Sequence, residues 1–213
     1  MRIGIFDSGI GGEAVAATLH KLLPSADIIC VNDHAHMPYG ERSQKEIIKL
    51  TKNSIKPLLD SDCDAIIIAC NTATTVAISD LRLTYPDVNF IGIEPMVKPA
   101  AAMTKTGSIA ICATSQTLQS DRYKELKRIW ASGVEVVEPD CGNWATLIEY
   151  GKSNEINTAP LIKLLIDHNV DVVVLGCTHY HWIKQNIIDA IGSMVTVLEP
   201  SDAIAERIKN LIS

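Results

Sequence analysis

The sequence predicts an α/β fold of two pseudo-symmetric domains with mostly parallel sheets and an active site between them. Short apolar runs alternate with helical patterns of about 10–15 residues, which is typical of βαβ units. Two stretches, 64–73 and 171–180, also share one pattern: an Asp, an apolar run, a small residue and a cysteine followed by polar groups. Such a run suits a parallel strand buried on both faces, and open α/β sheets bind ligands where these strands end.

A repeated spacing favours a duplication. Cys70 lies 63 positions after Asp7, and Cys177 lies 63 positions after Thr114. Asp7 and Thr114 each follow an apolar run of their own. We therefore predict two related halves, each giving two strand ends to a shared site.

The first half contains four predicted strands and three predicted helices. The strands are expected at 2–6, at 26–32, in the run before Cys70 and at 89–93; the helices at 13–23, 43–59 and 72–84. Pro24, Pro57 and Pro86 end or kink these helices, because proline lacks the amide donor that a helix needs. A glycine-rich turn at 9–12 precedes the first helix, and a loop at 33–40 follows the second strand.

The second half repeats this alternation. Strands are expected at 108–113, at 134–138, before Cys177 and at 195–198; helical segments at 116–131, 144–150, 159–168, 182–191 and 203–211. The predicted hinge is the proline-containing stretch 94–99, with a second crossing near Met194 that returns the chain to the first half. The domains would then be 1–96 plus 195–213, and 97–194.

Composition narrows the class of protein. The 213 residues are 47% hydrophobic and 21% charged, with a formal net charge of -6 and no basic cluster, which argues against a nucleic-acid partner. No apolar run approaches the roughly 20 residues of a membrane helix, and Asp7 comes too early for a signal peptide. The six cysteines are therefore expected to be free thiols in a reducing cytoplasm.

Cys70 and Cys177 are the candidate reactive residues. A buried cysteine commonly only fills space, and Cys30, Cys63, Cys112 and Cys141 are read that way. Cys70 and Cys177 instead stand at strand ends before polar side chains, where a following helix N-terminus would favour the thiolate. Two opposed thiols suit a reaction in which one removes a proton from carbon and the other donates a proton to the opposite face.

Asp7 and His179 are the candidate assistants of these thiols, because a carboxylate or an imidazole beside a thiol can take its proton or hold its charge. Two alternatives stay open at this point: Asp7 as a helix N-cap, and His179 as a core histidine with its hydrogen bonds satisfied. The assistants divide between the halves, Asp7 with Cys70 and His179 with Cys177.

Short polar residues at these strand ends are either helix caps or binders of a carboxylate; they are Ser8, Asn71, Thr72, Thr114, Thr117 and Thr178. The turn at 9–12 matches no dinucleotide fingerprint and no P-loop. The Asp, His and Cys residues at 33, 34, 36, 177, 179 and 181 match no zinc-site spacing. We expect no metal and no cofactor.

Several motifs, taken together, resemble those of the glutamate racemases, within the cofactor-independent aspartate/glutamate racemase superfamily. They are Asp7-Ser8-Gly9-Ile10-Gly11-Gly12, Pro38-Tyr39-Gly40, Cys70-Asn71-Thr72-Ala73, Gly92-Ile93-Glu94-Pro95, Thr114-Ser115-Gln116-Thr117 with Ser120 and Tyr123, Leu147-Ile148-Glu149 and Gly176-Cys177-Thr178-His179-Tyr180. They follow the family's order across nearly the whole chain. The Cys-Thr-His form resembles the glutamate branch, whereas the aspartate branch usually has Glu after its Cys-Thr.

The resemblance implies interconversion of L- and D-glutamate by two-base proton transfer, with no cofactor. Cys70 would act on the D-isomer and Cys177 on the L-isomer, with Asp7 and His179 assisting and Glu149 near His179. The implied substrate-binding residues are Ser8, Pro38, Tyr39, Gly40, Asn71, Thr72, Thr114, Thr117 and Thr178. D-Glutamate would supply peptidoglycan synthesis, and hence cell-wall formation and cell shape, in a bacterial cytoplasm. The expected partner is the small-molecule substrate, with no nucleic acid and no membrane; a homodimer is left open.

The chain departs from the family pattern in three places. His181 stands where the family usually has Pro, the second half is shorter between Tyr123 and Cys177, and Cys141-Gly142-Asn143-Trp144 replaces a more apolar stretch. Two alternatives therefore remain: a related racemase acting on another acidic amino acid such as aspartate, and a regulatory binding protein with little turnover.

Overall fold

The computed structural model describes residues 1–192, 195–199 and 204. Two compact units divide the chain, one comprising Met1–Glu94 with Ile204 in its core, the other spanning Pro95–Glu199 apart from residues 193–194. Apart from Ile204, the helix expected at 203–211 lies outside the described residues. Each unit is described by itself.

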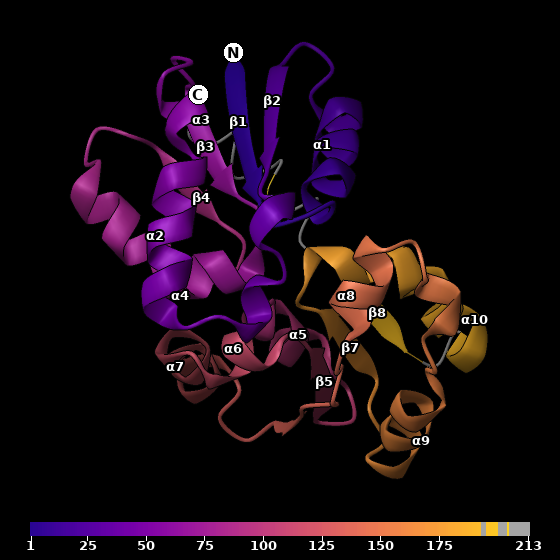
Figure 1. Cartoon of the computed structure of the whole chain (residues 1–213). Helices are drawn as coiled ribbons and strands as arrows, with labels where there is room; N and C mark the ends of the chain where they lie inside the picture. The colour runs from indigo at the N-terminus through magenta and orange to yellow at the C-terminus, as the bar shows by residue number, and fades with distance from the viewer. Residues whose placement is uncertain (193–194, 200–203, 205–213) are drawn as a thin grey trace. The chain divides into compact units, whose positions relative to one another are not determined.

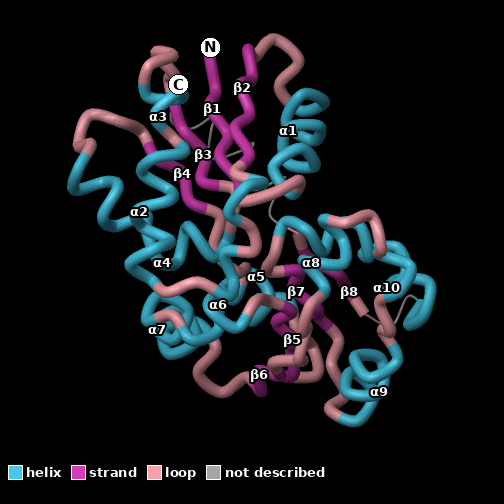
Figure 2. Tube along the Cα trace, in the orientation of Figure 1, coloured by secondary structure: helices cyan, strands magenta, loops and turns pink. Residues whose placement is uncertain are grey.

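The first unit is built on a four-stranded parallel sheet with the order β2-β1-β3-β4 (Figures 1 and 2). Its strands are β1 (Arg2–Asp7), β2 (Asp27–Asn32), β3 (Ala65–Ile68) and β4 (Phe90–Gly92). Its helices are α1 (Gly11–Leu22), α2 (Gln44–Ser54), α3 (Lys56–Leu59) and α4 (Asn71–Thr84), with short 3-10 helices η1 (His34–His36) and η2 (Tyr39–Glu41).

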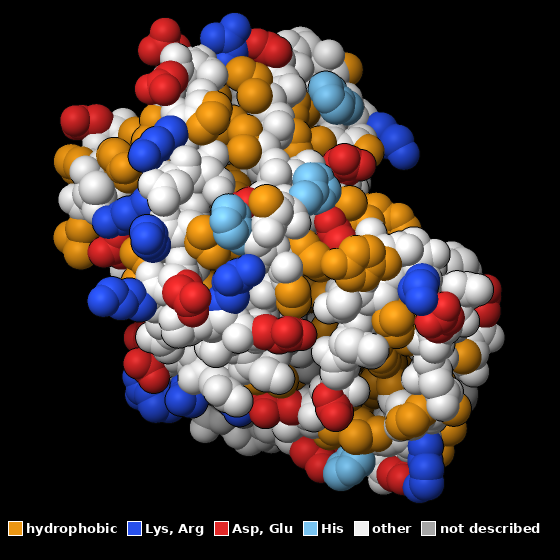
Figure 3. Space-filling view, viewed as in Figure 1, with side chains coloured by type: hydrophobic (Ala, Val, Ile, Leu, Met, Phe, Trp, Pro, Cys, Tyr) orange, Lys and Arg blue, Asp and Glu red, His pale blue; other side chains and the backbone are white. Residues whose placement is uncertain are grey.

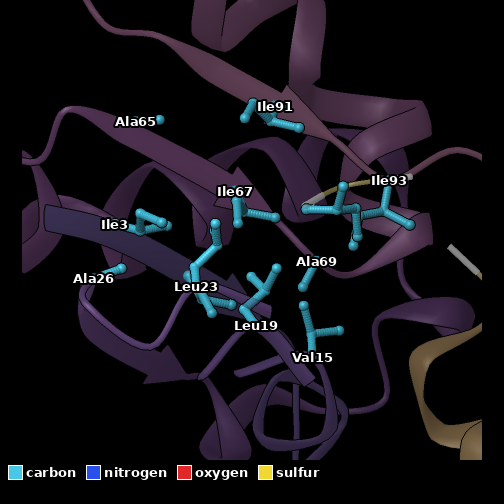
Figure 4. Packing of buried hydrophobic residues seen from close by; sticks show 12 residues of the cluster. Ile3, Val15, Leu19, Leu23, Ala26, Ala65, Ile67, Ala69, Ile91 and Ile93 are labelled. Carbon is cyan, nitrogen blue, oxygen red and sulfur yellow. The ribbon is translucent and has the colours of Figure 1, made fainter. Parts of the chain in front are cut away.

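Both faces of this sheet are buried, which explains the continuous apolar runs in the sequence. Ile67 points to the face covered by α1, where it joins Ile3, Val15 and Leu19 in one cluster (Figure 4). The neighbouring strand residues Phe6, Ile66 and Ile68 instead join a cluster with residues of α2, α3 and α4. Alternating side chains thus serve two different cores, as the two-residue period of a strand requires.

The helix predicted over 43–59 is two helices. Ser43 caps α2 in a capping box, in which its side chain accepts from the backbone of Glu46 and the Glu46 side chain accepts from the backbone of Ser43. Pro57 stands in the first turn of α3, where its missing N–H would have no helical partner in any case. The expectation that Pro57 interrupts the helix is confirmed.

The second unit contains a four-stranded parallel sheet with the order β6-β5-β7-β8. Its strands are β5 (Ser108–Cys112), β6 (Glu135–Val137), β7 (Val172–Leu175) and β8 (Thr196–Leu198). Its helices are α5 (Val97–Met103), α6 (Ser115–Gln119), α7 (Asp121–Trp130), α8 (Trp144–Glu149), α9 (Ala159–Asp167) and α10 (Lys184–Ile191), with 3-10 helices η3 (Ser153–Glu155) and η4 (Thr178–Ile183). The α/β class with two all-parallel sheets is therefore confirmed.

The two sheets share one connectivity, but the repeat is offset by one residue from the spacing seen in the sequence. Phe6 of β1 faces Ile68 of β3, 62 positions later, whereas Cys112 of β5 faces Leu175 of β7, 63 positions later. Counting from these paired ends, Thr114 corresponds to Ser8, and the equation of Thr114 with Asp7 was wrong.

The last described strand belongs to the second unit. The sequence analysis placed residues 195–213 in the first domain, yet β8 pairs with β7 from Val172–Thr196 to Val174–Leu198. Parallel pairing with β8 satisfies backbone N–H and C=O groups along an edge of β7 that would otherwise be open. Ile204, only five positions after Glu199, packs in the core of the first unit.

Asp64 and Asp171, which open the two matching stretches, each accept hydrogen bonds from the segment at the start of a neighbouring strand. Asp64 accepts a hydrogen bond from the backbone N–H of Arg2 at 2.7 Å. Asp171 accepts one from the Thr104 hydroxyl at 2.5 Å and one from the backbone N–H of Lys105 at 2.6 Å. These contacts explain why the pattern of each stretch begins with a carboxylate.

Replacing Asp171 by Asn is expected to lower the free energy of unfolding at pH 7 by about 1 kcal/mol, a value discounted for the exposure of the group. Partial burial acts to raise the pKa of Asp171, but hydrogen bonds from residues 104–106 outweigh it and hold that pKa below its ordinary value. A lowered pKa stabilises the fold above the ordinary value of about 3.9, and this contribution disappears as pH falls through the folded-state pKa. Urea unfolding at pH 7 and pH 2.5 tests this, and an undiminished difference at pH 2.5 would contradict it.

Charged side chains of both signs are interspersed on one face of the molecule. On the face shown in Figure 3, Lys and Arg lie among Asp and Glu without gathering into a basic patch. Within the described part of the chain, no helix combines the length and the apolar character needed to cross a membrane.

Candidate active site

Cys70 lies two residues beyond the end of β3, at the N-terminus of α4. Its Sγ accepts hydrogen bonds from the Ser8 hydroxyl at 3.3 Å and from the backbone N–H of Ala73 at 3.4 Å. The side chain is buried, with 5% of the residue exposed. Hydrogen-bond donors and the positive end of a helix both favour the thiolate, so the surroundings of Cys70 suit a base.

Asp7 ends β1 and is fully buried. Its Oδ2 accepts a hydrogen bond from the backbone N–H of Gly9 at 2.9 Å. The N-cap of α1 is Ile10, so the alternative that Asp7 caps this helix was wrong. A Cβ on Gly12 would lie 2.8 Å from the Asp7 Cβ and 2.5 Å from Asn32 Oδ1, so only glycine lets α1 approach these strand ends.

Asn71 presents a buried side-chain amide. It follows Cys70 directly and is 3% exposed, yet neither its Nδ2 nor its Oδ1 has a hydrogen-bond partner among the described residues. An unpaired buried amide is costly, and a ligand that supplies both an acceptor and a donor would satisfy it. Thr72, the next residue, is also buried.

A hydrogen-bonded group fixes Tyr39 in the loop that contains Pro38, Tyr39 and Gly40. The Tyr39 hydroxyl donates to Asp33 Oδ2 at 2.7 Å, and His36 Nδ1 lies 2.7 Å from Asp33 Oδ1. Burial, together with the bond to Asp33, raises the pKa of Tyr39 far above its ordinary value, so the hydroxyl stays protonated. This loop follows β2, at the same end of the sheet as Cys70.

Replacing Tyr39 by Phe is expected to lower the free energy of unfolding by about 1–3 kcal/mol, because it removes a donor from the largely buried Asp33 carboxylate. Urea unfolding measures the change. Tyr150→Phe is the control, since Tyr150 is 70% exposed and its loss of a hydroxyl should have little effect. Equal stability of the Tyr39 variant and the wild type would show that the hydroxyl does not fix the loop.

In the second unit, Thr114 caps α6 two residues beyond β5. Its Oγ1 accepts from the backbone N–H of Thr117 at 3.4 Å, and the two hydroxyls lie 3.0 Å apart. Thr117 is fully buried. The capping interpretation of Thr114 is therefore correct, and both hydroxyls lie at the carboxyl end of the second sheet.

Cys177 lies two residues beyond β7, and its Sγ is 3.9 Å from His179 Nδ1. His179 Nε2 is in turn 2.7 Å from Glu149 Oε2, and the two side chains are only 5% and 7% exposed. His179 is therefore a buried histidine with a carboxylate partner, as one alternative expected, and it also lies within reach of the Cys177 thiol. Thr178 starts η4 and is buried beside them.

Packing of α8 against η4 holds this pair together. The Trp144 ring of α8 meets the Tyr180 ring of η4 edge-on, with centroids 5.5 Å apart and planes at 71°. Tyr180 is almost completely buried. Because Glu149 ends α8 and His179 lies in η4, this aromatic contact keeps the carboxylate against the imidazole.

The two thiols have different surroundings. The sequence analysis expected a helix N-terminus after each cysteine. This is correct for Cys70, which precedes an α-helix, but no α-helix follows Cys177 directly. A 3-10 helix follows Cys177, its thiol caps no backbone group, and α10 begins only at Lys184. His179 provides the nearby polar group instead.

The predicted site residues thus form two groups, one at the carboxyl end of each sheet. The first contains Asp7, Ser8, Pro38, Tyr39, Gly40, Cys70, Asn71 and Thr72; the second contains Thr114, Thr117, Glu149, Cys177, Thr178 and His179. No cluster of His, Cys, Asp or Glu in the described residues is arranged to hold a metal ion.

Comparison with known proteins identifies the family. The family model of the Asp/Glu/hydantoin racemases matches residues 12–208. The chain belongs to this racemase family. A glutamate racemase from Aliarcobacter butzleri is 39% identical to this racemase over 99% of the chain and 84% of the relative.

Solved structures agree with this assignment. The Escherichia coli glutamate racemase, in complex with L-glutamate and the activator UDP-MurNAc-Ala, matches with a TM-score of 0.87 at 28% identity, over 99% of this chain and 82% of that one. The Francisella tularensis glutamate racemase, in complex with D-glutamate, matches with a TM-score of 0.83 at 29% identity, over 99% and 80%. This racemase is therefore an isomerase with the fold of those enzymes.

Sequence reasoning missed two residues of this racemase. Asp33 was considered only as a weak metal ligand, but it holds Tyr39 and His36. Its position directly after a predicted strand was the available signal. Glu199 was not singled out at all, although it contacts the element that follows Cys177.

Proposed function

We propose that this racemase interconverts L- and D-glutamate by two-base proton transfer. The observation that carries the proposal is the presence of one buried thiol at the equivalent strand end of each duplicated sheet. Relatives that bear the name glutamate racemase, at 35–39% identity, support glutamate as the substrate.

The proposed reaction consists of two proton transfers at Cα of the substrate. With L-glutamate, the Cys177 thiolate removes the Cα proton, and the electron pair of the C–H bond remains on the substrate as a carbanion. The Cys70 thiol then donates its proton to the opposite face of Cα and becomes a thiolate. D-Glutamate runs the same steps in reverse, so the mechanism requires both thiols to reach one bound glutamate.

Neighbouring groups would support each base. Ser8 and the Ala73 amide donate hydrogen bonds that stabilise the Cys70 thiolate. The His179–Glu149 pair would orient and assist Cys177, and Asp7 would assist Cys70. Proposed substrate contacts come from Ser8, Pro38, Tyr39, Gly40, Asn71, Thr72, Thr114, Thr117 and Thr178. The unpaired amide of Asn71 is the strongest of these, because a bound amino acid can supply its missing partners.

The proposed role of the product is to supply D-glutamate for peptidoglycan in a bacterial cytoplasm. The support is the bacterial origin of the relatives, which include enzymes from Aliarcobacter, Escherichia and Francisella. The oligomeric state is a separate question, and light scattering would distinguish a monomer from a homodimer.

Proton NMR of L-glutamate in D2O with the purified protein tests the proposal, without added cofactor and beside samples of L- and D-aspartate. We expect the glutamate α-proton signal to disappear, because each turnover introduces a solvent deuteron, and circular dichroism of the same sample to show that D-glutamate accumulates. Exchange in aspartate alone would overturn the proposed substrate. No exchange in either amino acid, with folded protein and reduced thiols, would favour a binding protein with little turnover.

A further inference from the structure

Glu199 links two elements at the carboxyl end of the second sheet. It follows β8 directly, and its Oε2 lies 2.7 Å from His181 Nδ1. Its Oε1 accepts from Lys184 Nζ, also at 2.7 Å. His181 belongs to η4 and Lys184 starts α10, so one carboxylate holds both sides of the junction between these helices.

The linked element is the one that carries the candidate base. Residue 177 precedes η4 immediately, and Thr178, His179 and His181 all lie within its six residues. A 3-10 helix has poorer hydrogen-bond geometry than an α-helix, so its shape depends more on outside contacts. β8 is paired with β7, the strand that leads into Cys177, and therefore offers a rigid support beside it.

The ionised carboxylate of Glu199 is stabilised by both of its partners. Hydrogen bonding to His181, which outweighs partial burial, and the bond to Lys184 lower the pKa of Glu199 to about 2. Glu199 is thus ionised at every pH at which the enzyme would be assayed. About a quarter of its side chain is exposed, so the link is partly shielded from solvent.

We propose that Glu199 is a positioning residue, which fixes η4 through His181 and Lys184 and so sets the position of the Cys177 thiol for proton transfer. The inference rests on the proposed two-base function. Loss of the link would displace Cys177 while leaving the groups around Cys70 unchanged.

Isotope effects in the two directions of the reaction test the proposal on Glu199→Gln. Deuterium at Cα of L-glutamate reports removal by Cys177, and deuterium at Cα of D-glutamate reports removal by Cys70. We expect kcat to fall about tenfold, with KM changed less, because small displacements of a reacting group are costly. The substrate isotope effect should rise from L to D, where Cys177 removes the labelled hydron, and fall from D to L, where Cys177 acts only in the later step.

Glu135→Gln is the matched control. Glu135 also pairs with a histidine nitrogen at 2.7 Å, that of His168, and it begins β6, far along the strand direction from Cys177. It should leave kcat and both isotope effects at wild-type values. If Glu199→Gln does not fold by circular dichroism, His181→Asn provides the second variant, with the same divergence of isotope effects expected.

The outcomes separate this inference from the proposed function. A wild-type enzyme without racemase activity refutes the proposed function. A wild-type enzyme that racemises glutamate, with folded variants whose isotope effects stay equal to its own or shift together in both directions, refutes only the role of Glu199.

Discussion

Replacing Cys70 by serine is expected to lower kcat for glutamate racemisation by about 10²–10⁴-fold, the usual contribution of a positioned proton-transfer group. A serine hydroxyl is a far weaker acid than a thiol and does not ionise near neutral pH, so the Ser8 and Ala73 donors would have no anion to stabilise. Cys177→Ser should have an effect of similar size. Circular dichroism detection of D-glutamate formation measures both.

The two serine variants should differ in the exchange that remains. With Cys70 replaced, Cys177 still deprotonates L-glutamate, so slow deuterium exchange in D2O is expected in the L-isomer and not in the D-isomer. Cys177→Ser should show the reverse. Cys63→Ser is the control, because Cys63 is half-buried in the first unit and outside the strand-end group. Wild-type turnover in either active-site variant would contradict the two-base assignment.

Replacing Glu149 by alanine is expected to lower the free energy of unfolding by about 1–3 kcal/mol, because it removes the buried carboxylate that lies 2.7 Å from His179 Nε2. For a chain of this size the melting temperature should fall by about 2–4 °C per kcal/mol. We also expect kcat to fall about 10²-fold, because the imidazole beside Cys177 loses its orientation.

Glu149→Gln separates orientation from charge. The amide oxygen of glutamine can still accept from His179 Nε2, so this variant should regain most of the stability but little of the rate if the negative charge assists proton transfer. Glu155→Ala serves as the control, since Glu155 forms an exposed pair with Lys152 in the same unit. Wild-type stability and rate in Glu149→Ala would show that the pair does not support Cys177.

The sequence predicts the layers of this fold well because its strongest signals are local. The runs before Cys70 and Cys177 are strands buried on both faces, and their apolar side chains show it directly. The single helix predicted over 116–131 is in fact two helices. Ser120 ends α6 and caps α7, where its side chain accepts a hydrogen bond from the backbone N–H of Tyr123. A Ser followed by Asp inside a helical pattern is a cap signal that could have been used.

Features that depend on distant partners were harder to predict. Nothing within residues 195–198 distinguishes pairing with β7 from a return to the first sheet, because strand pairing is decided by the free edge that the rest of the fold presents. The equal spacing of 63 positions indicated the duplication correctly but paired Asp7 with Thr114, and only the strand register shows Ser8 as the counterpart.

The same distinction applies to the candidate site. Cysteines and hydroxyls at strand ends follow from the chain pattern alone, and the structure groups them at the sheet ends as expected. The link from Glu199 to His181 joins residues 18 positions apart in sequence, and no local sequence pattern indicates that they are in contact. The buried position of Asp33 beneath Tyr39 likewise results from the path of the loop and not from its composition.

The unlike surroundings of the two thiols have a thermodynamic consequence for a racemase. Enantiomers have equal free energies in water, so the equilibrium mixture contains both in equal amounts however different the two bases are. The ratio kcat/KM must then be the same in both directions. The α-helix N-terminus at Cys70 and the His179–Glu149 pair at Cys177 can therefore make the maximal rates of the two directions differ, through unequal kcat values matched by equally unequal KM values. The direction of net conversion is still set only by which enantiomer is in excess.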